Sequence, residues 1–495
     1  MAAIRKDRRR RRPRSGSIAP MFGSVTRPMV VALIVACGLF MESLDGTVIT
    51  TALPTMATSF GDTPARLSLG VTVYMISLAI FIPISGWVAD RFGARTVFRA
   101  AIAVFTVGSI LCGLTHNLLE LAGARVVQGI GGAMMVPVGR LILLRSVSKP
   151  ELVRAMAYLT VPALLGPVLG PPVGGFITTY ASWRWIFFLN VPIGILGMVL
   201  VTLLIDNTRE ESTPDLDWFG FLSSGGALAG LVYGLDLIGR PLIAADVIVA
   251  MLAASVLLGA ITVWHALRHP HPLIDLSLLR VPTYCISIVG GSIFRIGSGT
   301  LPFLLPIMLQ VGFGATAFTS GLLTCAAAMG SFTMKMVARP ILRRFGFRRV
   351  LIGNGIVSGA SIMLCALFWP TTPYAVILGA LLLSGFFRSL QYTSLNTVAY
   401  AEIGAGRMSA ATSAASMMQQ LSNGLGVAFG ALILQVARHW SGTLTVGDFH
   451  AAFVLAGLVS LAAVVIFLRL HPTAGSEISG HRRAVEAIDV EPSSA

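Results

Sequence analysis

The stretch PMVVALIVACGLFMESLDGTVITTALP, residues 28–54, indicates the kind of protein to which this chain belongs. About 20 apolar residues in a helix span the ~30 Å hydrocarbon core of a lipid bilayer. Lipid offers the backbone no hydrogen-bonding partner, so such a stretch is expected to be helical. Thirteen more apolar stretches follow, at residues 67–89, 96–115, 118–144, 151–180, 184–205, 217–238, 243–266, 283–311, 316–338, 349–369, 373–400, 408–436 and 449–470.

The composition agrees with a chain that lies almost entirely in the membrane. Hydrophobic residues make up 55% of it, charged residues only 12%, and the mean hydropathy is +0.81. An ordinary soluble domain has about 25% charged residues. We therefore predict an all-α polytopic membrane protein with 14 transmembrane helices. The chain contains no HExxH motif, no GxSxG before a helix and no cluster of metal ligands, so we expect a transporter and not an enzyme.

The net charge of +15 is distributed in a way that indicates membrane topology rather than nucleic-acid binding. Nine Lys and Arg residues precede the first span, and most of the others lie in every second loop. With the N-terminus inside, twenty-seven of the 36 lie on the inside and four on the outside. Cytoplasmic loops of membrane proteins carry such an excess of basic residues. We expect both termini on the cytoplasmic side of a bacterial inner membrane.

Two sequence echoes indicate an internal repeat. Arg-Phe-Gly-x-Arg occurs at residues 91–95 after the second span and at 344–348 after the tenth. Arg-x-x-Gln occurs at residues 125–128 and again at 388–391. Together they predict two related six-helix bundles with two inserted helices between them. The predicted boundaries are a basic disordered tail at 1–27, bundles at 28–206 and 283–472, inserted helices at 207–268, a linker at 269–282 and a disordered tail at 473–495.

Two carboxyl groups lie within the first span. Glu42 and Asp45 are three residues apart and share one face of a helix. An ionisable group inside a span is costly and is a functional candidate by default. One interpretation is a proton or cation site that faces a central cavity. The other is a structural carboxylate paired with an arginine, and both stay open for each residue.

Arginine and lysine residues also occur within spans. Arg125, which is followed by Gln128, must have a carboxylate, backbone carbonyls or water as a partner, since it cannot lose its charge. Asp45 or Glu42 could be that partner, either in a proton switch or in a structural ion pair. Arg295, Lys335 and Arg388 could line the pathway and bind anionic groups, and the last two could instead snorkel or pair. Arg295 ranks first because small polar residues follow it.

The fifth span contains GPVLGPPVGG at residues 166–175. Its small residues, Gly166, Gly170, Gly174 and Gly175, allow close approach between helices. Prolines such as Pro171 remove backbone hydrogen bonds and bend a helix. The stretch predicts a pliable helix between the two halves, or else ordinary tight packing.

Neither the cysteines nor the histidines indicate a bound cofactor. All five cysteines lie inside apolar stretches and none forms a CxxC pair, so we expect no disulfide and no metal site. His269-Pro270-His271-Pro272 lacks further ligands nearby in the sequence and is interpreted as a linker. We therefore expect no cofactor, with a proton gradient as the energy source.

Four motifs in order, and a fifth stretch at the start of the first inserted helix, resemble those of the major facilitator superfamily. Residues 86–95, GWVADRFGAR, resemble its loop signature, and residues 125–132, RVVQGIGG, its fourth-helix signature. Residues 166–175 are similar to the fifth-helix signature associated with antiporters. LDGTVITTALP at 44–54 and DWFG at 217–220 resemble motifs of the fourteen-span drug:proton antiporters of the EmrB/QacA type.

The resemblance implies a role for several residues. Asp90 and the segment Arg91 to Arg95, with Gly86 and Gly93 in the same signature, would latch helices at the cytoplasmic face. Asp45 and Arg125 would belong to proton coupling. The second copy of the loop has Arg343 where the first has Asp90, so the second latch should be weaker or differently paired.

The implied function is proton-coupled export of small amphipathic drugs or metabolites by rocking of two halves. The implied protein works in a lipid bilayer as a monomer, on a small-molecule substrate and protons, without nucleic acid. An importer on the same fold, or an exporter of one endogenous metabolite, remains an alternative. A membrane sensor or scaffold would need a soluble output domain, and no loop is large enough for one.

Overall fold

The computed structural model describes residues 27–62, 67, 69–148, 151–207, 209, 213–237, 244–441 and 445–481, and their regular secondary structure is helical. The predicted N-terminal tail lies outside these residues except for Arg27. The first half of the chain forms α1 (Arg27–Phe60), α3 (Leu69–Phe81), α4 (Ser85–Phe92), α5 (Ala94–Leu114), α6 (Leu118–Ser146), α7 (Leu152–Tyr180), α8 (Trp185–Phe188) and α9 (Asn190–Leu204). The inserted pair is α10 (Trp218–Asp236) and α11 (Ala245–Arg268). The second half forms α12 (Pro282–Ser298), α13 (Leu301–Ile307), α14 (Ala317–Leu364), α15 (Tyr374–Val398), α16 (Met408–Ser441), α17 (Val446–Phe467) and the short α18 (Ser476–Ser479).

The all-helical membrane architecture is confirmed, but the predicted count of fourteen spans is not. Among the described residues, 11 helices are long and apolar enough to cross a membrane, or 12 if α3 and α4, bent by 59°, form one span. The predicted spans 316–338 and 349–369 both lie in α14, which has 48 residues. A straight helix of that length would measure about 72 Å, more than twice the hydrocarbon thickness. Gly346, with φ 72°, interrupts it with a non-helical conformation.

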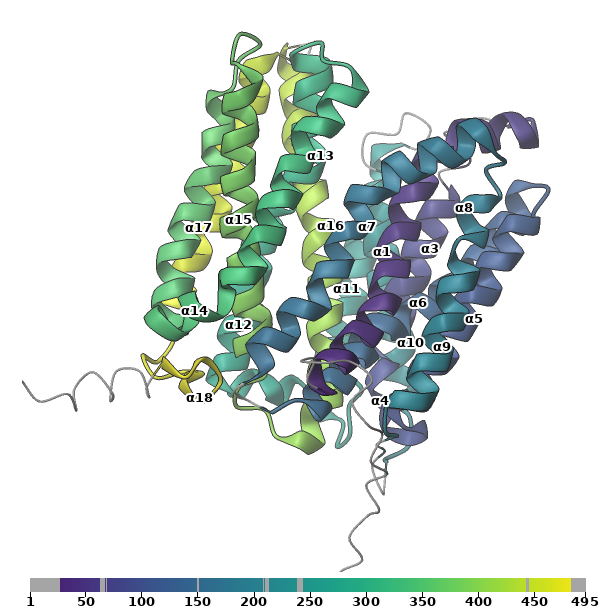
Figure 1. Ribbon diagram of the computed structural model, residues 1–495, viewed down its shortest axis with the longest axis vertical. Helices are drawn as coiled ribbons and strands as arrows, with labels where there is room; N and C mark the ends of the chain where they lie inside the picture. Colours follow the sequence, from purple (N-terminus) through teal and green to yellow (C-terminus); the bar gives the residue numbers. More distant parts are fainter. Residues whose placement is uncertain are drawn as a thin grey trace, which may run out of the picture.

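The helices form two bundles, α1–α9 and α12–α17, that lie side by side (Figure 1). The bundles approach each other at the end that carries α4, here named the latch end, and diverge toward the opposite end (Figure 1). The start of α1 and the helix α18 both lie at the latch end.

The apolar cores follow the same division. At the latch end one continuous core joins buried residues of both halves, among them Phe98 and Leu141 from the first and Leu342 and Phe467 from the second. Separate clusters belong to the individual halves, one around Leu44 in the first and one in the second. Burial of apolar side chains therefore holds the two bundles together at the latch end.

Polar contacts of α4 reinforce this junction. Ser85 Oγ lies 2.8 Å from Ser413 Oγ of α16. Asp90 accepts a hydrogen bond from Arg145 Nη2 at 3.0 Å and another from the hydroxyl of Ser409. Asp90 therefore links α6 of the first half to α16 of the second.

The rest of the loop binds the segment that leads to the inserted helices. Arg91 Nη1 donates to Thr213 Oγ1 at 3.3 Å, and Arg95 Nη1 donates to the carbonyl of Ile205 at 3.3 Å. Gly93 has φ 90°, which an L side chain rarely adopts, so the turn between α4 and α5 requires a glycine.

The second copy of this loop has different contacts. Arg343 makes no ion pair among the described residues, and its carbonyl lies 2.9 Å from His481 Nδ1. Arg348 Nη2 donates to the carbonyl of Leu468 at 3.2 Å.

The start of the predicted disordered tail differs from the prediction, because it forms the helix α18, in which Ile478 is buried. Residues 482–495 of that tail lie outside the described chain.

The inserted helices are tied to the first half and to the linker. Helix α10 packs on α3 and also contacts α16. Its N-cap, Asp217, is buried and accepts hydrogen bonds from the backbone N–H of Gly220 at 2.8 Å and of Leu273 at 3.1 Å. His265 Nε2 of α11 lies 2.8 Å from the same carboxylate. Burial by itself raises the pKa of Asp217, but these hydrogen bonds and the nearby His265 outweigh it and lower the pKa below its ordinary 3.8.

We expect Asp217→Ala to loosen the inserted pair, by about 1–2 kcal/mol for the lost cap and its hydrogen bonds. Because the folded-state pKa is lowered, this stabilisation is complete at neutral pH and disappears as the pH falls from 3.8 through the folded pKa. Thermal unfolding of the wild type and the variant should therefore differ at pH 7 and converge below that range. The exposed neighbour Asp215, changed to Ala, is the control. A difference that persists unchanged in acid would contradict this assignment.

Candidate functional site

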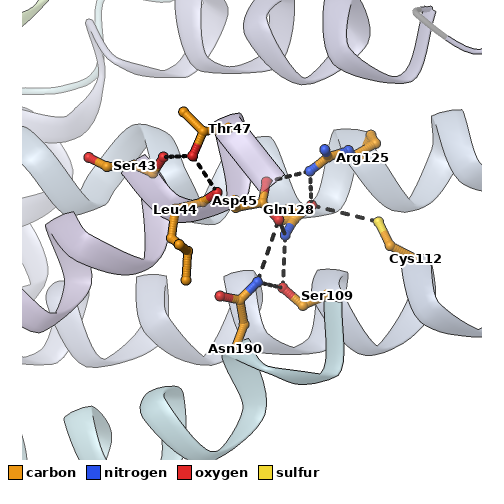
Figure 2. Close-up of polar contacts among 9 residues, drawn as sticks. All are labelled: Ser43, Leu44, Asp45, Thr47, Ser109, Cys112, Arg125, Gln128 and Asn190. Atoms are coloured by element: carbon orange, nitrogen blue, oxygen red, sulfur yellow. Dashed lines mark hydrogen bonds and ion pairs between the residues drawn. The ribbon is translucent and has the colours of Figure 1, made fainter. Parts of the chain in front are cut away.

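A buried ion pair lies inside the first half. Arg125 Nη1 of α6 lies 2.5 Å from Asp45 Oδ2 of α1, and the two side chains are only 1% and 2% exposed (Figure 2). The sequence offered Asp45 or Glu42 as the partner of Arg125, and the structure places Asp45 there. Helices α1 and α6 are separated by 80 residues in the chain at this point, so the contact depends on the tertiary fold.

Gln128 completes the coordination of both charges. Its Oε1 accepts from Arg125 Nη1 at 2.5 Å, and its Nε2 donates to Asp45 Oδ1 at 2.9 Å. The same Nε2 donates to Ser109 Oγ of α5 at 2.8 Å. Asn190 Nδ2, from the start of α9, lies 3.2 Å from Ser109 Oγ and 3.5 Å from Asp45 Oδ1. These five residues, from four helices, are here named the Asp45 cluster (Figure 2).

Close helix packing brings the Asp45 cluster together. A Cβ on Gly108 of α5 would lie 2.6 Å from the backbone nitrogen of Gln128, so only glycine permits this approach of α5 to α6. Two rings flank the guanidinium of Arg125, those of Tyr74 and Phe187, with centroids 5.1 and 5.3 Å away. Aromatic faces attract a cation, most strongly when it is desolvated.

The glycine-rich helix α7 packs on the turn of α1 that carries Asp45. Added Cβ atoms would lie 2.6 Å from Ser43 Cβ at Gly166 and 2.1 Å from Thr47 Oγ1 at Gly170. Thr47 Oγ1 donates to the carbonyl of Gly166 at 3.2 Å.

The rest of the predicted motif in α7 is less closely packed. Gly174 is buried, but a Cβ at Gly175 would meet nothing within 4 Å. The side chain of Pro171 lies outside the description. The first two glycines therefore permit the close approach of α7 to the turn of α1 that contains Ser43 and Thr47.

Several polar atoms around the cluster are buried without a hydrogen-bond partner among the described residues. They are Glu42 Oε2, Tyr74 Oη, Arg125 Nε and Asn190 Oδ1. Glu42 lies one turn before Asp45, and both carboxyl groups are close enough to Tyr74 for their charges to act on it. Each unpaired polar atom in a dry interior is energetically unfavourable. The site therefore has unused hydrogen-bonding capacity, which includes one oxygen of the Glu42 carboxyl.

The cations of the second half lie apart from this cluster. Arg295 Nη2 of α12 donates to Asn396 Oδ1 of α15 at 2.9 Å. Lys335 Nζ of α14 donates to Thr393 Oγ1 at 2.5 Å. Arg388 is half-buried and lines a cavity of about 350 Å³ between α13, α14 and α15. The structure thus joins Asp45, Arg125 and Gln128 but places Arg295 elsewhere.

One group of side chains in the described part of the chain has the composition of a metal site. The ligand atoms of Asp217, His265 and His269 lie within 4.8 Å of one another at the end of the inserted helices. Both carboxylate oxygens of Asp217 already accept hydrogen bonds from backbone N–H groups. The expectation of a plain linker at His269 did not foresee this grouping, because Asp217 is 52 residues away in the sequence.

The sequence interpretation also missed four polar residues. Ser109 and Asn190 contact Asp45 or its partner Gln128, and Arg140 and Asn396 belong to a network described below. A single asparagine in an apolar helix is a recognisable signal, because amide side chains in membrane helices usually bond across to a neighbour. Ser109 gave no such signal, since serine is common in membrane helices.

Comparison with known proteins agrees with the fold. The Major Facilitator Superfamily profile matches residues 35–423 and 287–491. The chain is 38% identical to "Putative multidrug resistance protein MdtD" of Serratia proteamaculans over 85% of this chain and 88% of that one. It is 36% identical to the protein of the same name from Escherichia coli O6:H1, over 91% and 96%.

A solved structure has the same overall arrangement at much lower sequence identity. The crystal structure of the human organic anion transporter MFSD10 (TETRAN) superposes with a TM-score of 0.63 at 14% identity, covering 90% of this chain and all of that one. This likeness concerns the fold alone. From the profile match and the two bacterial relatives, the chain is a multi-pass membrane protein that belongs to the major facilitator superfamily of transporters.

Proposed function

We propose that this protein is a proton-coupled antiporter that exports small amphipathic compounds across a bacterial cytoplasmic membrane. The observation that carries the proposal is the buried pair of Asp45 and Arg125, held by Gln128 between α1 and α6. Ionisable groups inside a membrane bundle mark proton relays and ion pathways. The names of the bacterial relatives, which refer to multidrug resistance, support export of foreign or endogenous small molecules.

The Asp45 cluster couples proton binding to helix movement through one charge. When Asp45 is ionised, it neutralises Arg125, and the pair holds α1 against α6. When Asp45 takes a proton, Arg125 loses its counter-charge in a dry interior, which costs several kcal/mol unless the helices rearrange or water enters. A proton from outside therefore favours a different arrangement of the first half.

The proton gradient supplies enough energy for export. One charge that crosses about 100 mV gains about 2.3 kcal/mol, and a tenfold difference in proton concentration adds about 1.4 kcal/mol. One proton per cycle therefore supports a cargo gradient of a few hundredfold. The chain works without a bound cofactor in this scheme, as a monomer with both termini in the cytoplasm. An importer would differ in the direction of proton flow when cargo is added outside.

We expect Asp45→Asn to abolish proton-driven transport in proteoliposomes, because the amide cannot take up and release a proton. Counterflow of cargo without a proton gradient should continue. The single variant leaves Arg125 buried without a counter-charge, which destabilises a protein by about 3–5 kcal/mol. Stability and transport are therefore both measured.

The matched control is the double variant Asp45→Asn with Arg125→Gln, which removes both charges and keeps hydrogen-bonding groups. It should recover thermal stability but not proton coupling. If the double variant recovers both stability and proton-driven transport, the pair is only structural. If the single variant keeps full proton coupling, Asp45 is not the proton-binding residue.

The latch end must open for the opposite state of the cycle. A Cβ on Gly86 would lie 2.7 Å from Ser413 Oγ and 2.8 Å from the carbonyl oxygen of Ser409. Helices α4 and α16 touch here only because position 86 has no side chain. Closure of the latch end therefore depends on this glycine.

We expect Gly86→Leu to hold the latch end open. Spin labels are attached at the exposed positions 99 and 339, one in each half, in a variant without the native cysteines. The distance between the two labels should increase by several ångströms in Gly86→Leu. Export should fall because the cycle stalls. Gly379→Leu is the control, since a Cβ at Gly379 meets nothing within 4 Å. Unchanged label distances in Gly86→Leu would show that the latch end closes without this contact.

A further inference from the structure

The second half carries positive charge inside the membrane without any carboxylate to balance it. Between Pro282 and Leu470 the only acidic residues in the sequence are Glu402 and Asp448. Glu402 lies in the loop after α15, and Asp448 lies in the first turn of α17. Arg295 and Lys335 lie within helices of this half and are buried. The balance of charge in this half therefore differs from that in the first half.

Arg295 is held by neutral groups. Its Nη2 donates to Asn396 Oδ1 at 2.9 Å, and its guanidinium lies 5.3 Å from the centre of the Tyr392 ring. The ionisable groups that act on it in the described structure are Tyr392, Tyr400 and another cation, Arg140. Hydrogen bonds and an aromatic face hold the guanidinium in place but do not neutralise its charge.

Arg140 reaches the same network from the first half. It lies in α6, is buried, and donates to Tyr400 Oη and Gln419 Oε1, both at 3.2 Å. Its Nε has no hydrogen-bond partner among the described residues. Gln419 Nε2 in turn donates to Asn396 Oδ1 at 3.2 Å. The two guanidinium groups are thus joined through two neutral amides, one from α16 and one from α15.

Lys335 of α14 is a third buried cation, and it contacts α15, the helix that carries Asn396. Its Nζ donates to Thr393 Oγ1, three residues before Asn396 on α15. Among the described residues, neither Lys335, Arg295 nor Arg140 has an ion pair with a carboxylate, whereas Arg125 in the first half has one. Uncompensated charge in a low-dielectric interior is costly, and proteins keep such charge where it has a function. A ligand with negative charge would remove that cost.

We propose that the network of Arg140, Arg295, Gln419 and Asn396 binds the anionic group of the cargo, which is therefore a small organic anion such as a carboxylate, sulfonate or phosphate ester. Guanidinium groups suit this purpose because their fixed N–H donors match the oxygens of such groups. The free Nε of Arg140 is one donor that the anion can take. Because Arg140 belongs to one half and Arg295 to the other, a bound anion bridges the halves.

This inference rests on the proposed transport function, but the site for cargo is separate from the Asp45 cluster. Arg140 lies fifteen residues beyond Arg125 on α6, about four helical turns away. Anion binding and proton coupling can therefore be disrupted independently, so the two proposals can fail independently.

The test is ligand binding to the full-length protein in phosphatidylcholine nanodiscs, where no anionic lipid competes. Two xanthene dyes of opposite charge, fluorescein and tetramethylrhodamine methyl ester, are compared by fluorescence polarisation. Thermal unfolding is measured with benzoate, benzenesulfonate and phenyl phosphate, and with benzylamine and phenyltrimethylammonium. We expect the anions to raise the unfolding temperature more than the cations, and fluorescein to bind more tightly than the rhodamine.

Arg295→Gln should weaken anion binding by about tenfold or more, while Arg295→Lys retains part of it. Arg339→Gln, at an exposed position of α14, is the matched control and should bind anions as the wild type does. Arg295→Gln should also fold with undiminished thermal stability, because it removes an unbalanced charge and keeps an amide. Asp45→Asn should still prefer anions to cations, so loss of coupling there leaves this proposal intact.

The proposal is overturned if no anion stabilises the wild type more than its cationic counterparts, or if Arg295→Gln leaves anion affinity unchanged. Weaker fluorescein binding after phosphatidylglycerol is added to the nanodiscs, with no stabilisation by any soluble anion, would assign the site to a lipid headgroup and exclude cargo. A third outcome is that the protein exports the cationic dye with proton flow, and that Arg295→Gln does not change this export. That result would support the proposed antiporter and exclude an anion-specific site.

Discussion

The high cost of leaving a charge unbalanced inside the membrane is the constraint on which the two halves of this structure differ. In the first half the balance is internal, since Asp45 neutralises Arg125 and Gln128 forms a hydrogen bond with each of the two charged groups. That arrangement requires α1, α5, α6 and α9 to meet within hydrogen-bonding distance. The glycines of α5 and α7 permit it by removing side chains from the contacts. The ion pair and the close packing of these four helices therefore depend on each other.

The second half keeps the outline of that arrangement but not its charge balance. Gln391, at the position that echoes Gln128, accepts from Asn354 Nδ2 at 2.8 Å and donates to the carbonyl of Leu351 at 3.1 Å. These bonds also join neighbouring helices, but they involve only neutral groups. The two halves thus use a similar amide to hold their helices together. Only the first half combines it with an acid that can exchange a proton.

Much of the fold could be predicted from the sequence, because hydrophobic length and charge asymmetry depend on the bilayer and not on tertiary contacts. The pairing of Asp45 with Arg125 was one of a few possibilities, because a buried arginine needs a carboxylate, backbone carbonyls or water as its partner. The roles of Ser109 and Arg140 could not be predicted. Serine usually bonds within its own helix, and an arginine near the end of a span resembles a residue that extends to the interface. The two spans predicted within α14 are separated at Gly346, where the backbone is not helical.

The sign of the cargo's charge decides how the membrane potential enters the cycle. Export of a monovalent cation in exchange for one proton moves no net charge, so the pH difference alone drives it. Export of a monovalent anion in exchange for one proton moves two charges in the favourable direction when the interior is negative, which adds about 4.6 kcal/mol per 100 mV. A half with unbalanced cations, beside a half that exchanges protons in the proposed cycle, is suited to the second case. The uneven charge of the two halves therefore fits the proposed cycle, in which both components of the proton gradient would drive export of an anion.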